Sequence, residues 1–397
     1  METKGIDFFK LNEMFSKEER LVSNSVREFV TKEIKPLIKD AFHREEPLPF
    51  KEIAPRMGDL GMLGVFLPEE YGCPGGNYIE FGLICQEVER VDSSLRSFIA
   101  VTSGLVMYPI WKFGDEEQRK KYLPKLAKGE LIGCFGLTEP NHGSDPASME
   151  TTAKKDGSMW VLNGTKTWIT EGEIADIAVV FAKDVDDGKI KGFIVEKGTP
   201  GFTQREITQK GSMRAGGVGE LGFMNCKIPA RNLLPHTRGL KAPLMCLNQA
   251  RYGISWGAIG AAMDCYETAL NYTKERTQFG QPLAGYQLVQ EKLVKMFMEI
   301  SKGQLVSYRV GRLLDEGKGT PEMISFAKKN NVWVARMCAR TARELLGANG
   351  ISLDYSPIRH MANIESVYTY EGTNDIHTLI LGQYITGIQS FTRWVQK

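Results

Sequence analysis

The amino-acid sequence predicts an α+β fold in which a small β-domain lies between two helical domains. Apolar residues recur at helical intervals over the first 130 residues and again after Pro235. Between Leu131 and Leu234 they instead alternate or form short blocks separated by turn residues, which is typical of strands. A chain of 397 residues, 42% of them hydrophobic, is long enough for two or three packed domains. We therefore expect domains at residues 1–130, 131–236 and 237–397.

The first domain is predicted to be all helical. Ser16 and Glu19 have the spacing of a capping box, which starts an apolar pattern that runs to about Phe42. Further helical patterns cover residues 49–60, 78–90, 94–113 and 116–126. The prolines and glycines between residues 66 and 77 predict a loop.

The middle domain is predicted to be a small barrel or sandwich of short strands. Asn163-Gly164 between two apolar runs is a strong signal for a two-residue hairpin turn. Gly217, Gly219 and Gly222 have the GxGxxG spacing of a dinucleotide-binding turn, but a strand-like segment follows them. Because that fingerprint works only where a strand leads into a helix, we exclude a nicotinamide site here.

The last domain is predicted to be an antiparallel four-helix bundle. Long helical patterns joined by short connections favour this packing. The four patterns cover about residues 240–277, 286–316, 321–346 and 375–391.

Composition excludes several classes of function. The net charge of +2, from 50 basic and 48 acidic residues spread along the chain, gives no reason to expect nucleic acid or an anionic membrane surface. No signal, transit or transmembrane segment is visible, and the location expected is cytoplasmic. The seven scattered cysteines contain no CxxC pair, and no two histidines have metal-ligand spacing, so we expect free buried thiols and no metal site.

One stretch near the end of the chain, YTYEGTNDIH at residues 368–377, combines a carboxylate with an aromatic and a glycine-threonine step. An apolar helical pattern begins directly after it. Glu371 could therefore simply precede a helix N-terminus, where negative charge is favourable. It could also be a functional carboxylate, and the stretch alone does not decide between the two interpretations.

Other motifs leave the same choice open. GLTEPNHGSD at residues 136–145 is rich in turn residues, which suit either an ordinary loop or a loop that offers N–H groups and hydroxyls to a phosphate or a polar ring. Trp168 at a strand end is either a core residue or a flat ring beside a ligand. RTQFG at residues 276–280 and GANG at 347–350 read first as helix stops.

Glu89 and Arg96 stand seven residues apart, so they lie on one side of a helix if that helix is continuous. A surface ion pair is the ordinary interpretation. If the pair instead faces a cavity, Arg96 offers a planar fork to a ligand carboxylate, and Glu89 offsets its charge when no ligand is bound.

In this order, GLTEPNHGSD, KTWIT, RTQFG and YEGTNDIH resemble the acyl-CoA dehydrogenase family over nearly the whole chain. Within the family, QEVERVDSSLRS and CLNQARYGISWG are most similar to the branch that oxidises glutaryl-CoA. The resemblance implies FAD as cofactor, an acyl-CoA substrate, an electron-transferring flavoprotein as acceptor, and a homo-oligomer, usually a tetramer.

The resemblance also implies positions that bind FAD. Within one subunit these are Phe135, Leu137, Thr138, Gly143, Ser144, Trp168, Ile169, Thr170, Thr373, Asp375 and Phe391. A second set matches positions that reach the FAD of a neighbouring subunit: Arg276, Gln278, Phe279, Gln287, Glu344, Leu345, Gly347 and Ala348.

By the same resemblance, Glu371 is the general base that removes the α-proton, and its backbone N–H polarises the thioester carbonyl. Arg96 and Ser97 match residues that bind the distal carboxylate of glutaryl-CoA, with Glu89 as acidic neighbour. Tyr370 matches the residue of decarboxylating members, whose product is crotonyl-CoA. Further positions match the acyl-CoA channel: Ser144, Leu247, Asn248, Arg251 and Gly372.

Three positions depart from the family pattern: Glu171 replaces an Asn, Ala348 a glycine, and His142 a small residue. Two rival functions also remain at this point. One is a short-chain or non-decarboxylating acyl-CoA dehydrogenase or oxidase, and the other is a flavin- or CoA-binding protein without turnover.

Overall fold

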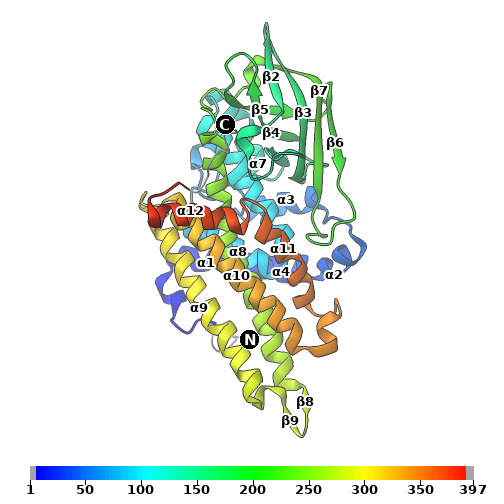
Figure 1. Cartoon of the computed structure of the whole chain (residues 1–397), viewed down its shortest axis with the longest axis vertical. Helices are drawn as coiled ribbons and strands as arrows, with labels where there is room; N and C mark the ends of the chain where they lie inside the picture. The colour runs from blue at the N-terminus through cyan, green and yellow to red at the C-terminus, as the bar shows by residue number, and fades with distance from the viewer. Residues whose placement is uncertain (1–5, 390–397) are drawn as a thin grey trace, which may run out of the picture.

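The computed structural model describes residues 6–389 and has a β-domain seated on helices at one end (Figure 1). The N-terminal helices follow the predicted order. Their bounds are α1 Lys17–Phe29, α2 Lys35–Arg44, α3 Phe50–Asp59, α4 Tyr78–Val91, α5 Ser93–Ala100, α6 Tyr108–Phe113 and α7 Glu116–Ala127. Two π-helical joints, Val30–Ile34 and Val101–Met107, connect α1 to α2 and α5 to α6. Among the described residues, no helix is both long and apolar enough to cross a membrane.

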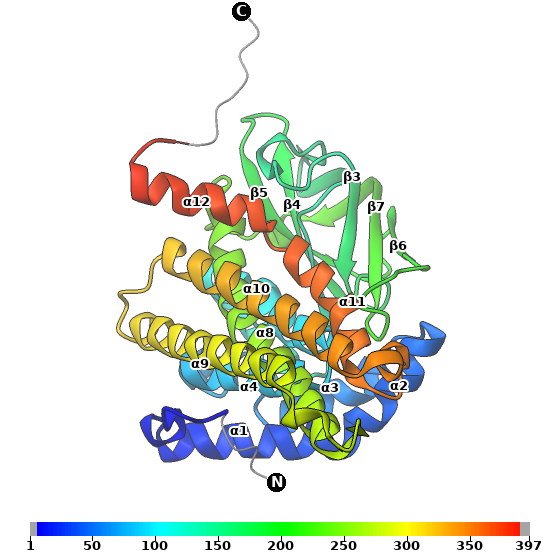
Figure 2. The same cartoon turned by 60° about the horizontal axis from the view of Figure 1, so that its bottom comes forward.

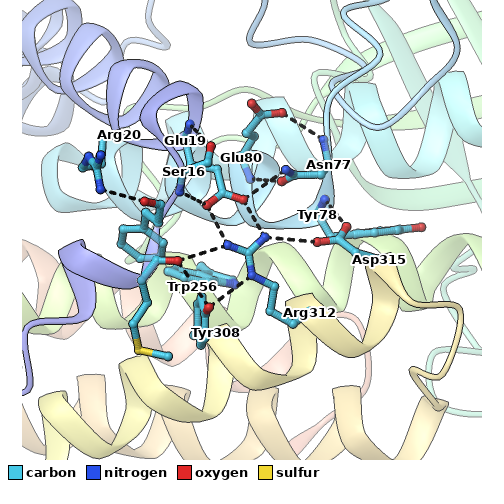
Figure 3. Close-up of polar contacts among 12 residues, drawn as sticks. Ser16, Glu19, Arg20, Asn77, Tyr78, Glu80, Trp256, Tyr308, Arg312 and Asp315 are labelled. Carbon is cyan, nitrogen blue, oxygen red and sulfur yellow. Dashed lines mark hydrogen bonds and ion pairs between the residues drawn. The ribbon is translucent and has the colours of Figure 1, made fainter.

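The predicted capping box at Ser16 is present, and its Glu19 has a second role (Figure 3). The Glu19 carboxylate accepts hydrogen bonds from both terminal nitrogens of Arg312, each at 2.7 Å, and from Asn77 Nδ2 at 3.0 Å. Asn77 caps α4, while Arg312 lies on α9 of the C-terminal domain. This buried carboxylate therefore ties the first helix to two elements far away in the sequence.

The middle domain forms one seven-stranded sheet. Its strand order is β1-β4-β2-β3-β7-β6, with β5 paired to β4. The strands are β1 Gly133–Gly136, β2 Thr152–Asp156, β3 Met159–Thr170, β4 Ile177–Asp184, β5 Ile190–Glu196, β6 Phe202–Glu206 and β7 Val218–Pro229. Gly219 and Gly222 lie inside β7, so GxGxxG is not a strand-to-helix turn.

The predicted hairpin at Asn163-Gly164 is wrong. Strand β3 runs through both residues, and its register against β7 shifts between Leu162 and Gly164. Gly164 has φ +145°, and a Cβ there would lie 2.7 Å from the backbone of Thr151. Glycine is therefore needed here because the strand bulges and its backbone packs closely against Thr151. The real turn is at Gly157, between Asp156 and Met159, which are paired across β2 and β3.

The C-terminal domain is helical, as predicted, but its fourth packed helix is not the expected one. Helices α8 Lys241–Glu275, α9 Gln287–Asp315 and α10 Pro321–Leu345 pack together, and α11 Ser356–Thr369 joins them against α8 and α10. The predicted last helix, α12 Asn374–Thr386, lies on the side of α10 away from α9 (Figure 2). Apolar periodicity did not predict α11 because its buried face includes Arg359, His360 and Asn363.

All seven cysteines are free and buried, as the sequence predicts. A short two-stranded ribbon, β8 Thr277–Gln278 and β9 Gln281–Pro282, joins α8 to α9. It lies at the end of the molecule opposite the β-domain (Figure 1).

Candidate active site

The helix carrying Glu89 and Arg96 is not continuous. Asp92 is extended, at φ −162°, and separates α4 from α5. Its buried carboxylate accepts from Ser94 N at 2.8 Å, Arg359 Nη1 at 2.6 Å and Asn363 Nδ2 at 2.9 Å. Asp92 thereby caps α5 and fixes the break to α11.

Across this break, Glu89 and Arg96 still meet. Arg96 Nε lies 2.6 Å from Glu89 Oε2, and both side chains are fully buried, so the ordinary interpretation of a surface pair is wrong. Arg96 Nη1 and Glu89 Oε1 are shielded from solvent and have no hydrogen-bond partner among the described residues. A buried guanidinium nitrogen without a partner is costly, which indicates a site for a further acceptor.

Gly257 on α8 makes room for this pair. A Cβ at that position would lie 2.0 Å from Glu89 Oε2 and 2.9 Å from Arg96 Cγ. Gly257 carries no signal in the sequence, because a glycine within a long apolar helix gives no sign of what approaches it.

Arg96 also reaches the YTYEGTNDIH stretch. Its Nη2 donates to the hydroxyl of Tyr370, and its guanidinium carbon lies 5.4 Å from the centre of the Tyr370 ring. Next to Arg96, Ser97 Oγ lies 3.3 Å from Thr170 Oγ1 at the end of β3. The structure thus brings together four predicted residues from three distant segments.

Glu371 lies between α11 and α12, in left-handed backbone conformation at φ +53°. Its Oε2 is shielded and has no hydrogen-bond partner among the described residues. Burial raises the pKa of the carboxyl above its ordinary value, and the positive charges of Arg96, Arg251 and Lys328 offset part of this effect. The helix cap is instead Thr373, whose Oγ1 accepts from Ile376 N at 3.2 Å. Glu371 is therefore not the N-cap of α12.

The predicted flavin segments lie side by side. Thr167 N on β3 donates to Thr138 O after β1 at 2.9 Å, and buried Lys166 donates to Leu137 O at 3.1 Å and Glu139 Oε1 at 2.8 Å. Trp168 is 63% exposed, so it is not a core residue. Phe135, Leu137 and Ile169 are buried.

The predicted channel residues are more dispersed. Arg251 Nε donates to the Glu371 carbonyl oxygen at 2.7 Å, and Arg251 Nη1 to Asn248 Oδ1 at 3.3 Å. Gly372 follows the base at φ +94°. Leu247 is half-buried on α8, and Ser144 and Gly143 are exposed in the loop after β1.

The second predicted cofactor set is not near this site within the chain. Arg276, Gln278 and Phe279 lie at the β8–β9 ribbon, and Phe279 is 96% exposed. Exposed residues of the same set are Gln287 at the start of α9 and Glu344, Gly347 and Ala348 near the end of α10, whereas Leu345 is buried. Asp375 is exposed on α12, and Phe391 lies outside the described residues.

Two of the three departures from the family pattern, Glu171 and His142, make local polar contacts, and nothing in the structure explains Ala348. Glu171 is buried, and its Oε1 accepts from Gly217 N at 3.3 Å. Burial and the nearby Glu173 raise the pKa of Glu171 well above its ordinary value. His142 Nε2 lies 3.3 Å from Glu150 Oε1.

Comparison with known proteins identifies the family. Three family models match in order: the acyl-CoA dehydrogenase N-terminal domain over residues 16–130, the middle domain over 134–226, and the C-terminal domain over 237–386. The chain belongs to the acyl-CoA dehydrogenase family. These enzymes are FAD-dependent oxidoreductases, so the fold class, enzyme class and cofactor predicted from the sequence are confirmed.

Individual acyl-CoA dehydrogenases match over almost their full length. Glutaryl-CoA dehydrogenase from Mycobacterium smegmatis superposes with a TM-score of 0.95 at 48% identity, covering 98% of this chain and 100% of that one. A structure of that organism's glutaryl-CoA dehydrogenase with FADH2 gives a TM-score of 0.95 at 47% identity, with 98% and 99% covered. An acyl-CoA dehydrogenase of Bacillus subtilis is 35% identical over 376 residues, covering 94% of this chain and 99% of the relative.

The residues present fit the flavin of an acyl-CoA dehydrogenase. The exposed indole of Trp168 offers a flat apolar face, and the hydroxyl of Thr170 lies two residues on. In the adjoining loop, no atom lies within 4 Å of the position of a Cβ at Gly143. An aromatic face beside hydroxyl and backbone donors suits a polar ring system.

Proposed function

We propose that this acyl-CoA dehydrogenase oxidises glutaryl-CoA, with Glu371 as general base, and decarboxylates the product to crotonyl-CoA. The observation that carries the proposal is Arg96, a buried guanidinium with one unpaired nitrogen beside Tyr370 and Ser97. A terminal carboxylate of the acyl chain supplies the missing acceptor, and charge-assisted hydrogen bonds to a planar fork favour that geometry.

Glu371 takes the α-proton of the thioester. Its carboxyl is buried and its pKa is raised, which suits a base that must remove a weakly acidic proton. The Glu371 N–H stabilises the negative charge that develops on the thioester oxygen. Trp168 and Thr170 would hold FAD, which would supply a hydride acceptor for the β-carbon.

Decarboxylation follows from the position of the distal carboxylate. Once the α,β double bond exists, the bond to that carboxylate breaks, carbon dioxide leaves, and the electron pair passes into the conjugated thioester. The resulting dienolate takes up one proton and gives crotonyl-CoA. The positive charge of Arg96 stabilises this negative charge, and Tyr370 lies against the guanidinium.

The remaining features belong to the same proposal. The electrons pass to an electron-transferring flavoprotein. The protein is a homo-oligomer, a tetramer as is usual in the family, in which the exposed residues around Phe279 reach the FAD of a neighbouring subunit. Exposure of so large an apolar side chain supports a covered position in the assembly.

One observation favours a second candidate substrate. Because Glu89 already pairs with Arg96, an uncharged short acyl chain would not leave the guanidinium without a counter-ion. The deciding experiment adds glutaryl-CoA or butyryl-CoA with an artificial electron acceptor to the purified flavoprotein. Preference for glutaryl-CoA with crotonyl-CoA as product supports the proposal. Glutaconyl-CoA as product would refute decarboxylation, and a preference for butyryl-CoA would refute glutaryl-CoA as the substrate.

A further inference from the structure

Two buried cations hold the backbone on both sides of Glu371. Lys328 Nζ, on α10, donates to Tyr370 O at 3.2 Å and to Gly372 O at 2.9 Å. Arg251 Nε, on α8, donates to Glu371 O at 2.7 Å. Three consecutive carbonyl oxygens are therefore each bound by a basic side chain, and burial lowers the pKa of Lys328 to about 7.

Neither of these two side chains forms an ion pair within the described residues. Lys328 is 1% exposed and Arg251 is 6% exposed. Within residues 6–389, no carboxylate oxygen lies within 4.0 Å of a charged nitrogen of either side chain. The nearby Glu371 carboxyl offsets part of the cost of burying these charges, and their hydrogen bonds to this loop offset more of it.

The geometry of the peptide between Tyr370 and Glu371 gives Lys328 a second effect. No described peptide bond is cis, so the Tyr370 C=O and the Glu371 N–H lie in one plane and point in opposite directions. By binding the oxygen, Lys328 fixes the direction of the N–H. That N–H has no protein acceptor among the described residues.

A cation on the carbonyl oxygen also polarises the peptide. It draws electron density toward the oxygen, which makes the N–H of the same unit a stronger donor. Hydrogen bonds aimed at a developing oxyanion contribute most where they are fixed before the reaction.

We propose that Lys328 is a positioning residue of the reaction, which holds and polarises the Tyr370–Glu371 peptide so that the Glu371 N–H stabilises the enolate oxygen. This inference rests on the proposed function, in which Glu371 is the base and its N–H meets the thioester carbonyl. Lys328 touches neither substrate nor cofactor in this scheme and acts through the backbone.

A purely structural role is the competing explanation. Glu371 at φ +53° and Gly372 at φ +94° form a loop in an uncommon conformation, which any pair of strong donors could hold. A measurement of enolate stabilisation separates the two explanations, because it does not depend on turnover or on electron transfer.

The experiment titrates acetoacetyl-CoA bound to the holoenzyme and follows the ultraviolet absorption of its enolate with pH. Lys328→Met removes the charge and the donor, and Lys328→Gln keeps a donor without the charge. Lys329→Met is the matched control, because that neighbouring lysine donates to Thr378 Oγ1 at 2.8 Å and to Asn374 O at 3.4 Å. Flavin content and melting temperature are recorded for every variant.

We expect Lys328→Met to reduce the bound enolate about tenfold at a given pH and kcat about 10–100-fold, with KM little changed. Bound enolate and kcat in Lys328→Gln should lie between the values of Lys328→Met and wild type. This variant provides the test if Lys328→Met does not fold. If a folded Lys328 variant binds the enolate with the same pH dependence as wild type, or if Lys329→Met reduces the bound enolate equally, the proposed role of Lys328 is overturned. Either outcome leaves the proposed base in place. Failure of the wild-type protein both to bind the enolate and to oxidise any acyl-CoA overturns the proposed base as well.

Discussion

The guanidinium of Arg96 lies 2.6 Å from the carboxylate of Glu89 through Nε and donates through Nη2 to the hydroxyl of Tyr370. The residue before the proposed base is thus joined directly to the proposed carboxylate-binding arginine. This relationship links recognition of the acyl chain to the chemistry at its other end, and it can be tested at each residue.

Arg96→Gln should lower kcat/KM for glutaryl-CoA by about 100-fold, and that for butyryl-CoA much less, because only the first substrate loses a charge-assisted bond of about 3 kcal/mol. The variant also leaves Glu89 buried without its cation. Chemical denaturation should therefore show a loss of about 3–5 kcal/mol in the free energy of unfolding. The double variant Glu89→Gln/Arg96→Gln is the control and should recover much of that stability. Equal losses for both substrates would contradict the carboxylate-binding role.

Tyr370→Val should raise the fraction of glutaconyl-CoA among the products of glutaryl-CoA oxidation, because it removes both the ring and the hydroxyl beside Arg96. Tyr370→Phe is the matched variant, since it keeps the ring and loses only the hydroxyl. Chromatography of the CoA products gives the ratio directly. An unchanged ratio in Tyr370→Val would eliminate this residue from decarboxylation.

Glu371→Gln should lower kcat by about 10²–10⁴-fold, because an amide cannot take the α-proton. The control is Glu365→Gln on α11, an exposed carboxylate paired with Arg336 at 2.7 Å, which should retain wild-type turnover. Steady-state kinetics with an artificial acceptor measures both. Full activity in Glu371→Gln would refute the assignment of the base.

The raised pKa of Glu371 also has a consequence for stability. The folded protein binds this proton more tightly than the unfolded chain, so the contribution of Glu371 is favourable below its ordinary pKa of 4.5 and is lost as pH rises through the raised value. Relative to wild type, Glu371→Gln should therefore gain stability between about pH 4 and pH 8. Urea unfolding at both pH values measures the difference, and a constant difference would contradict a raised pKa.

Gly257→Ala should disturb the Glu89–Arg96 pair, because the new methyl group would lie 2.0 Å from Glu89 Oε2. Overpacking of this kind costs about 1–3 kcal/mol, and we expect a selective loss of activity toward glutaryl-CoA. Gly211→Ala is the control, since no atom lies within 4 Å of a Cβ there. Thermal melts and substrate comparison test the prediction, which fails if both alanine variants behave alike.

The sequence by itself determined the order of helical, β and helical domains, because apolar periodicity and capping residues act locally. It also determined the family, because YEGTNDIH and the other motifs occur in the family's order over nearly the whole chain. The free, buried state of the cysteines followed from their scattered positions. Even a strong local signal failed at Asn163-Gly164, where Thr151 packs closely against Gly164 and the two residues form a bulge within β3 instead of a hairpin turn.

Only the tertiary structure decided what surrounds Glu371. Lys328 and Gly257 carry no motif, and their importance appears only when α10 and α8 pack against the loop and against α4. The break at Asp92 depends on Arg359, which is 267 residues away in the chain. Contacts of this kind arise from burial and from the need to satisfy buried polar groups, neither of which a local pattern records. The sequence thus pointed to Glu371 as the proposed base, and only the packed fold showed the cations and the space around it.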